Sequence, residues 1–366
     1  MKYLTLVSVL AITTAPVVAR ASTLTDSFSS FWVLGDSLSD NGNTATMVGG
    51  LIAQQPGPIP LPPPNPLQQP GVSSDGFTWA KEFTDAFSAA GKATYNLSFG
   101  AARATNNASG PPDLAAQNDE DTQFSTTFTF GPGLSLSGSV QKYPDGSGGL
   151  IDRKSTWGDN PLVTVFVGGN DFLDATFDVA QSLAADPFSN PDVVDETLNS
   201  VKSQIDRLVL EGIDDFIVMN LPDFSVIPQF NGAAAPLGAA LSLAASRYNT
   251  QLEDYLDLLR GDGIDVTTVD IFNSLTDSQK LDEFGLTEVD NACVDSVDPQ
   301  TGDCSGFLYF DNIHPTAEGH RLVAEITREQ LNKTYQLQAV PLPAPALMLI
   351  TALSGTLLLR RRKTIQ

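Results

Sequence analysis

Short segments with strand character that alternate with helical patterns are the feature of this chain that restricts its fold most. The candidate strands lie at 31–34, 95–99, 163–167, 216–219 and 266–271, and polar or glycine-containing segments follow them. Apolar residues recur at helical spacing over 194–210, and further helices are expected over 239–259 and 316–331. Strands that alternate with helices predict an α/β fold, a three-layer α/β/α sandwich whose parallel central sheet is covered on both faces.

The segment 106–147 departs from this pattern, because it is rich in Gly, Ser, Thr and Asp. Polar and apolar residues alternate over 124–130 and again over 134–140, which predicts an antiparallel β-hairpin inserted in the main fold. The insertion could line a substrate pocket or form a lid, and the sequence leaves both open. Residues 56–70 are dense in proline and are expected to form a surface loop.

The charge balance excludes one class of partner. The chain has 43 Asp and Glu against 20 Lys and Arg, a formal net charge of -23. Such a surface repels phosphate backbones, so no nucleic acid partner is expected. A solvated surface explains the charge, and a neutral or cationic substrate would also suit it.

The N-terminal segment has the three parts of a secretory signal. Lys2 precedes an apolar run over 3–18, and Ala-Arg-Ala follows at 19–21, so a signal peptide is predicted over 1–21. Cys293 and Cys304 are the two cysteines of the chain. In an exported chain a pair this close predicts a disulfide rather than a metal site.

The C-terminal segment is also unusual. Beyond a domain predicted over 22–333, a linker and the motif Val-Pro-Leu-Pro-Ala fill 334–344, and an apolar segment with a basic tail fills 345–366. The apolar stretch is barely long enough to cross a bilayer, and its basic end would stay in the cytoplasm. The order resembles the VPLPA-CTERM sorting tails of Gram-negative bacteria, which implies membrane contact, cleavage by a sorting protease and delivery to the cell surface, outer membrane or medium. The alternative is a permanent tail anchor.

A candidate nucleophile follows the first predicted strand. Ser37 lies in Gly-Asp-Ser-Leu at 35–38, just past the strand and at the start of an expected helix. Backbone N–H groups and a helix N-terminus there would favour a developing negative charge, as an acyl-transfer nucleophile requires. An ordinary helix N-cap is the alternative.

Two further clusters could supply donors at the same sheet edge. Gly100 follows the strand at 95–99, and a glycine can present its backbone N–H to a ligand without a Cβ in the way. Asn170 follows the strand at 163–167, and its side chain offers an N–H₂ group. In isolation each pattern is also typical of a simple turn.

Only two histidines are present, so a histidine-dependent mechanism must use His314 or His320. His320 falls within the helix predicted over 316–331 and is expected to be a surface or packing residue. His314 lies in the preceding loop, and Asp311 three residues earlier could bond one ring nitrogen and fix the tautomer. Alternatively, Asp311 caps the next helix.

Together these blocks resemble, in order, the four blocks of the GDSL (SGNH-hydrolase) lipase and esterase family. The resemblance implies that Ser37, Asp311 and His314 form a catalytic triad, and that Ser37, Gly100 and Asn170 form the oxyanion hole. Secondary matches to the lecithinase/hemolysin-like branch are Ser-Asp-Gly-Phe-Thr-Trp at 74–79, Asn-Leu-Pro-Asp at 220–223 and Tyr-Asn at 248–249. One departure is Ala101, because the family usually shows paired glycines at 100–101.

The resemblance implies hydrolysis of carboxylic esters, lipid or acyl, through an acyl-serine intermediate and without a metal or cofactor. Two other functions fit the same sequence. A surface acyltransferase or polysaccharide deacetylase could use the same triad, and a non-catalytic cell-surface or matrix protein could use the same scaffold.

Overall fold

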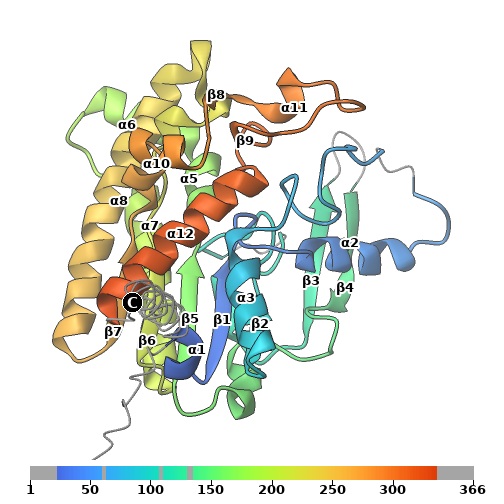
Figure 1. The fold of residues 1–366 in the computed structure, drawn as a ribbon, viewed down its shortest axis with the longest axis vertical. Coiled ribbons are helices and arrows are strands. Elements are labelled where there is room, and N and C mark those ends of the chain that lie inside the picture. The colour runs from blue at the N-terminus through green and yellow to red at the C-terminus, as the bar shows by residue number, and fades with distance from the viewer. Residues whose placement is uncertain (1–22, 60–62, 107–109, 130–134, 336–366) are drawn as a thin grey trace, which may run out of the picture. The chain divides into compact units, whose positions relative to one another are not determined.

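A sheet of five parallel strands forms the middle layer. The computed structural model describes residues 23–59, 63–106, 110–129 and 135–335. The strands are β1 (Ser30–Gly35), β2 (Ala93–Asn96), β5 (Pro161–Phe166), β6 (Asp215–Met219) and β7 (Asp265–Val269). Their order across the sheet is β2-β1-β5-β6-β7, and every neighbouring pair is parallel (Figure 1).

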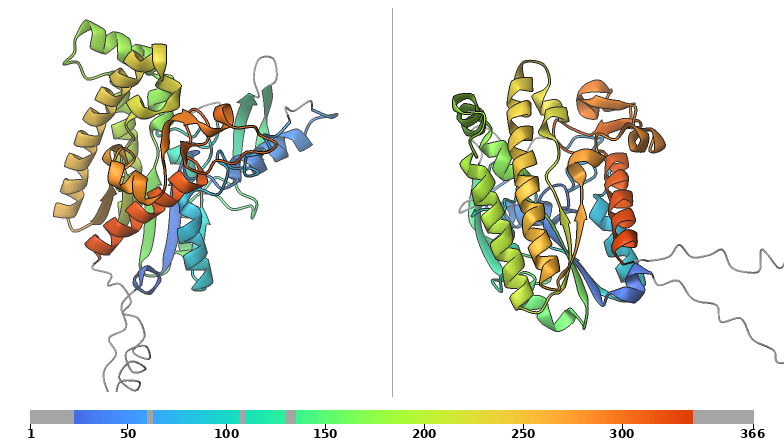
Figure 2. Two further views of the ribbon diagram at one scale, coloured as in Figure 1. Left: turned by 45° about the horizontal axis from the view of Figure 1, so that its top comes forward. Right: turned by 90° about the vertical axis from the view of Figure 1, so that its left-hand side faces the viewer.

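Helices cover both faces of this sheet, so the three-layer α/β/α prediction is confirmed (Figure 2). One face bears α3 (Trp79–Ala89) and α12 (Ala317–Thr334), and the other bears α7 (Asp192–Leu210) and α8 (Ala235–Gly261). The shorter helices are α1 (Leu24–Ser27), α2 (Asn43–Ala53), α4 (Leu114–Asn118), α5 (Gly169–Asp174), α6 (Thr176–Ala185), α9 (Ile271–Ser274), α10 (Ser278–Glu283) and α11 (Cys293–Ser296). Short 3₁₀ helices are η1 (Ile151–Thr156), η2 (Phe224–Val226), η3 (Pro228–Phe230) and η4 (Gly232–Ala234).

Burial explains why the central strands were visible in the sequence. Every residue of β1, β5 and β6 is buried, because helices cover both faces. Such strands appear as continuous apolar runs rather than as alternating ones. The edge strand β2 is only half-buried and ends at Asn96, earlier than the predicted 95–99. Leu97 and Phe99 still donate backbone hydrogen bonds to β1, at 2.8 and 3.2 Å.

The predicted hairpin insertion is confirmed. Strands β3 (Gln123–Thr129) and β4 (Ser135–Gln141) pair antiparallel with Gln123 opposite Gln141. The hairpin packs on α2 beside the main sheet (Figure 1). Gln54, at the C-terminal end of α2, donates a side-chain hydrogen bond to the backbone carbonyl of Ser139, at 3.0 Å. Strand β4 of the insertion is therefore attached to the fold through α2.

A second excursion precedes α12. Strands β8 (Glu288–Ala292) and β9 (Phe307–Tyr309) form a small parallel sheet, and Cys293 and Cys304 form the predicted disulfide between them. The chain then enters the loop 310–316 and begins α12, where the Thr316 hydroxyl accepts a hydrogen bond from Gly319 N–H. This excursion positions the loop that contains Asp311 and His314.

The C-terminal end of the domain extends slightly beyond the predicted boundary at 333. Thr334 still belongs to α12, and the Tyr335 ring packs edge-on against Phe28 while its hydroxyl donates to Asp215. The predicted signal peptide (1–21), the rest of the linker and sorting motif (336–344) and the apolar segment with its basic tail (345–366) lie outside the described residues. Within the described residues, none of the helices combines the length and apolar character needed to cross a membrane.

Candidate active site

Ser37 lies in a turn immediately past the carboxyl end of β1. The Gln117 side chain fixes the strand end by bonding both the N–H and the carbonyl of Gly35, each at 2.8 Å. The carbonyl of Asp36 accepts hydrogen bonds from Ser39 and Asp40, which closes the turn around Ser37. The expected helix does not start here, because α2 begins only at Asn43. A turn, rather than a helix N-terminus, therefore presents the serine.

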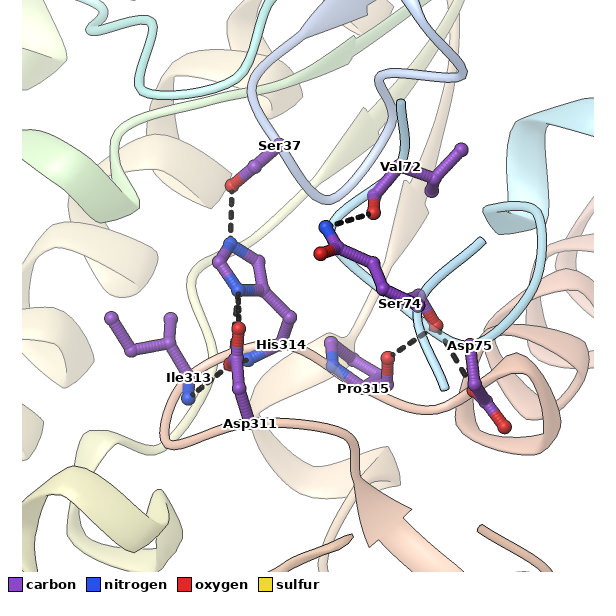
Figure 3. A network of polar contacts seen from close by, with 9 residues as sticks. Ser37, Val72, Ser74, Asp75, Asp311, Ile313, His314 and Pro315 are labelled. Atoms are coloured by element: carbon purple, nitrogen blue, oxygen red, sulfur yellow. Dashed lines mark hydrogen bonds and ion pairs between the residues drawn. The ribbon is translucent and has the colours of Figure 1, made fainter. Parts of the chain in front are cut away.

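His314 lies between Ser37 and Asp311 and is hydrogen-bonded to both (Figure 3). Its Nε2 atom is 2.8 Å from the Oγ of Ser37, and its Nδ1 atom is 2.8 Å from the Oδ2 of Asp311. The Asp311 carboxylate also accepts the backbone N–H groups of Ile313 and His314, at 2.9 and 2.7 Å. The structure thus brings together the three residues predicted to form a triad.

A motif from the N-terminal half holds the histidine loop in place. Ser74 donates its hydroxyl to the Pro315 carbonyl at 2.9 Å, as Figure 3 shows. Asp75 accepts the backbone N–H of Ala317 at 2.7 Å. A Cβ on Gly76 would lie 2.6 Å from the Cβ of Ala317, so glycine permits the close approach. Sequence reasoning noted this segment only as a family match and missed its positioning role.

Two carboxyl groups near the site, Asp311 and Asp36, have pKa values shifted in opposite directions. Burial opposes ionisation of Asp311, but the hydrogen bonds and charge of His314 outweigh it and hold its pKa below the ordinary 3.8. Burial raises the pKa of Asp36 to about 7, against the opposing effects of the Leu38 N–H and of His314. Asp311 is therefore the ionised partner of the imidazole at neutral pH.

Asn170 lies on the first turn of α5, beyond β5, and lines the same cavity as Ser37. Its side-chain Nδ2 donates to the carbonyl of Ala102 at 2.8 Å. An amide nitrogen has two hydrogens, so one N–H remains available. The neighbouring Asp171 accepts the N–H groups of Ala104 and Thr105, at 2.8 and 3.0 Å, which joins the loop after β2 to α5.

Gly100, the residue predicted to supply a backbone oxyanion donor, has an N–H group that is already occupied in this structure. Its N–H group already donates to the Asp40 carboxylate at 3.0 Å and to the Thr44 hydroxyl at 2.6 Å. The next residue differs: Ala101 is exposed, has a φ of 60°, and its N–H has no hydrogen-bond partner among the described residues. The sequence signal for this difference is the departure at Ala101, where the family usually shows the second of two paired glycines.

An apolar cavity opens beside the serine. Ser37 and Asn170 both line it. Apolar side chains beyond the carboxyl ends of β5, β6 and β7 form much of its wall, among them Leu173, Leu221, Phe224, Ile227, Ile271 and Leu275. No described residue of the hairpin insertion lines it. The described part of the insertion is therefore not a wall of this cavity.

Known proteins resemble this chain over most of its length. Residues 32–327 match the model of the GDSL-like lipase/acylhydrolase family. The phosphatidylcholine-sterol acyltransferase of Aeromonas hydrophila is 22% identical over 360 residues, which cover 85% of this chain and 92% of the relative.

Solved structures give more distant matches. An acetylxylan esterase from Geobacillus stearothermophilus is 13% identical, with a TM-score of 0.36, and the match covers 83% of this chain and 94% of that one. Phospholipase A1 from Streptomyces albidoflavus is 15% identical, with a TM-score of 0.35, over 84% of this chain and 99% of that one. Because the family model spans most of the sequence, this protein belongs to the GDSL-like lipase/acylhydrolase family and is a carboxylic ester hydrolase of the esterase and lipase type.

Proposed function

We propose that the enzyme cleaves lipid or other acyl esters through an acyl-serine intermediate on Ser37. The observation that supports this most is the continuous chain of hydrogen bonds from Ser37 through His314 to Asp311. Such an arrangement lets the imidazole act as general base for the hydroxyl while the carboxylate fixes its tautomer.

The reaction has two halves. His314 Nε2 accepts the Ser37 proton as Oγ attacks the ester carbonyl carbon, and it then gives that proton to the leaving alcohol as the ester C–O bond breaks. In the second half His314 takes a proton from water, whose oxygen attacks the acyl carbon. The carboxylic acid leaves, and the proton returns to Ser37.

The oxyanion of each tetrahedral intermediate requires donors at the sheet edge. We assign these to the Ser37 N–H, to the remaining Asn170 side-chain N–H and to the Ala101 N–H, which replaces Gly100. Ala101 is the one described non-glycine residue with a positive φ. Backbone strain of this kind is concentrated at functional sites, which supports the assignment.

An apolar acyl group is the substrate that the cavity supports. Because apolar side chains form most of its wall, a hydrocarbon chain attached to a carbonyl at Ser37 would be desolvated there. The lecithinase/hemolysin-like matches at 74–79, 220–223 and 248–249 favour the same choice over the acetyl group of a polysaccharide.

Acyl transfer to an alcohol is the second candidate. The relative that favours it is named as a phosphatidylcholine-sterol acyltransferase, and it aligns with most of this chain. The triad chemistry is the same in both cases, and the acceptor of the acyl group decides between them. Incubation with phosphatidylcholine and a sterol distinguishes them, since transfer yields a sterol ester and hydrolysis yields free fatty acid.

We also propose that the protein is exported and reaches the bacterial cell surface, outer membrane or medium. The signal-like segment 1–21 and the sorting-like tail at 340–366 support export. The disulfide between Cys293 and Cys304 supports it too, because disulfides persist mainly in oxidising compartments. Mass spectrometry of protein recovered from a Gram-negative host tests it: a mature chain that starts at Ser22 and lacks the tail is expected.

The decisive experiment for catalysis compares the full-length protein with Ser37→Ala on p-nitrophenyl esters. A loss of at least ~1,000-fold in kcat, with an unchanged circular dichroism spectrum, is expected. Near-normal turnover by the variant would overturn the acyl-serine mechanism. A folded wild type without turnover on any ester would favour the non-catalytic surface protein.

A further inference from the structure

Two side chains lie between the apolar cavity and a second, outer hollow. Trp79 at the start of α3 and His320 on α12 both line the cavity beside Ser37. The same two residues also line a second, outer hollow, together with Phe77, Lys81, Arg321 and Ala324. The helices α3 and α12 pack against each other there (Figure 1). Trp79 and His320 are therefore a wall between the cavity and the hollow.

Both members of the wall are held inside the fold. Trp79 is 1% exposed, and its indole Nε1 donates to the Ser39 hydroxyl at 3.2 Å. His320 is 2% exposed, and its Nδ1 atom is buried with no hydrogen-bond partner among the described residues. Because the His320 ring makes no hydrogen bond to described residues, its removal breaks none and leaves a space instead.

The chemistry of His320 suits an apolar neighbour. Burial and, to a smaller extent, the nearby charge of His314 together lower its pKa to about 3. The His320 ring is therefore uncharged at neutral pH. A neutral ring places no charge against a hydrocarbon chain, whereas a charged side chain in this position would exclude one.

We propose that His320 and Trp79 limit the length of the acyl chain, because they block its path from the cavity to the gap between α3 and α12. The inference rests on the proposed function, since it takes the occupant of the cavity to be the hydrocarbon chain of the acyl group bound at Ser37. His320 is then a specificity-determining residue of the ester hydrolase, and it has no part in the chemical step.

The test measures kcat/KM of the full-length protein for p-nitrophenyl esters from acetate to palmitate. His320→Ala joins the cavity to the outer hollow, so the ratio of kcat/KM for palmitate to that for butyrate should rise at least about tenfold. Each further methylene removed from water is worth about fourfold, so only a few need to enter the new space. His320→Leu refills the space with an apolar side chain and should return the ratio to the wild-type value.

Arg321→Ala is the matched control, because Arg321 lies on the same helix and lines only the outer hollow. It should leave the ratio unchanged. An unchanged ratio in a folded, active His320→Ala would overturn the proposal. So would the same altered ratio in His320→Leu and His320→Ala, since the lost ring nitrogen rather than the open wall would then be the cause.

Binding separates this inference from the proposed function. Calorimetry with 2-alkanones of increasing chain length measures the cavity without turnover. If no ester is hydrolysed but His320→Ala binds the longer ketones more tightly than wild type does, the proposed ester hydrolysis is wrong. The proposal that His320 limits the length of the cavity is then still supported. If esters are hydrolysed but neither the kcat/KM ratio nor ketone binding changes in His320→Ala, only the proposal that His320 limits chain length is wrong.

Discussion

The Nε2 atom of His314 lies 2.8 Å from the Oγ of Ser37, although 277 residues separate the two along the chain. The contact depends on two separate supports. The turn after β1 holds the serine, and the loop between β9 and α12 holds the histidine. The two residues meet only because the sheet brings the turn after β1 and the loop before α12 to the same edge.

Asp311→Asn should lower kcat by about 10,000-fold with little change in stability. The asparagine oxygen can still accept the backbone N–H groups of Ile313 and His314. Its N–H₂ group would face Nδ1 of His314, however, and favour the tautomer that cannot accept the serine proton. Stopped-flow and steady-state kinetics with circular dichroism check this. A loss below tenfold would show that Asp311 does not orient the ring.

Asn170→Ala should reduce kcat by about 100- to 1,000-fold and change KM little. The variant removes the proposed oxyanion donor, which acts on the intermediate more than on the bound ester. It also removes the hydrogen bond from Nδ2 to the Ala102 carbonyl. Asn170→Asp keeps the shape without the donor and serves as the second variant. Full activity in Asn170→Asp would remove Asn170 from the oxyanion hole.

Replacement of both cysteines by serine should lower the free energy of unfolding by about 3 kcal/mol, the value expected for a short closed loop. The cysteines are 11 residues apart, and the disulfide packs against Phe310, next to Asp311. Activity should therefore fall at a lower urea concentration than in wild type. Urea unfolding monitored by fluorescence and by esterase activity checks this. Coincident curves for wild type and variant would contradict it.

His320→Leu should make the protein more resistant to acid. Burial lowers the folded-state pKa of His320 to about 3, whereas the unfolded side chain titrates near 6.5. The unfolded state therefore binds the extra proton first, and wild type loses stability as the pH falls below about 6.5. Between pH 7 and pH 5 this loss amounts to about 2 kcal/mol, and His320→Leu should avoid it. Urea unfolding at the two pH values measures the difference. An equal loss in both proteins would show that His320 titrates normally.

The local chemistry of the site could be predicted from the sequence. The run at 163–167 is apolar and β-branched because helices cover β5 on both faces, and every residue of the strand is buried. Burial of this kind can be recognised directly in the sequence. Asp311 and His314 are three residues apart, and that spacing alone lets the carboxylate accept the histidine N–H and face its ring. Short-range geometry decides both features, so the residues that matter are neighbours in the sequence.

Long-range packing decided the rest. The sequence favoured Gly100 because a glycine presents its N–H without a Cβ in the way. In the structure that N–H is bound by Asp40 and Thr44, and the positive φ falls on Ala101. His320 looked like an ordinary helix residue, and only the packing of α12 against α3 made it the wall of a cavity. The sequence gives the type of each side chain. Its hydrogen-bond partners and the space beside it depend on segments that are distant along the chain and meet only in the folded structure.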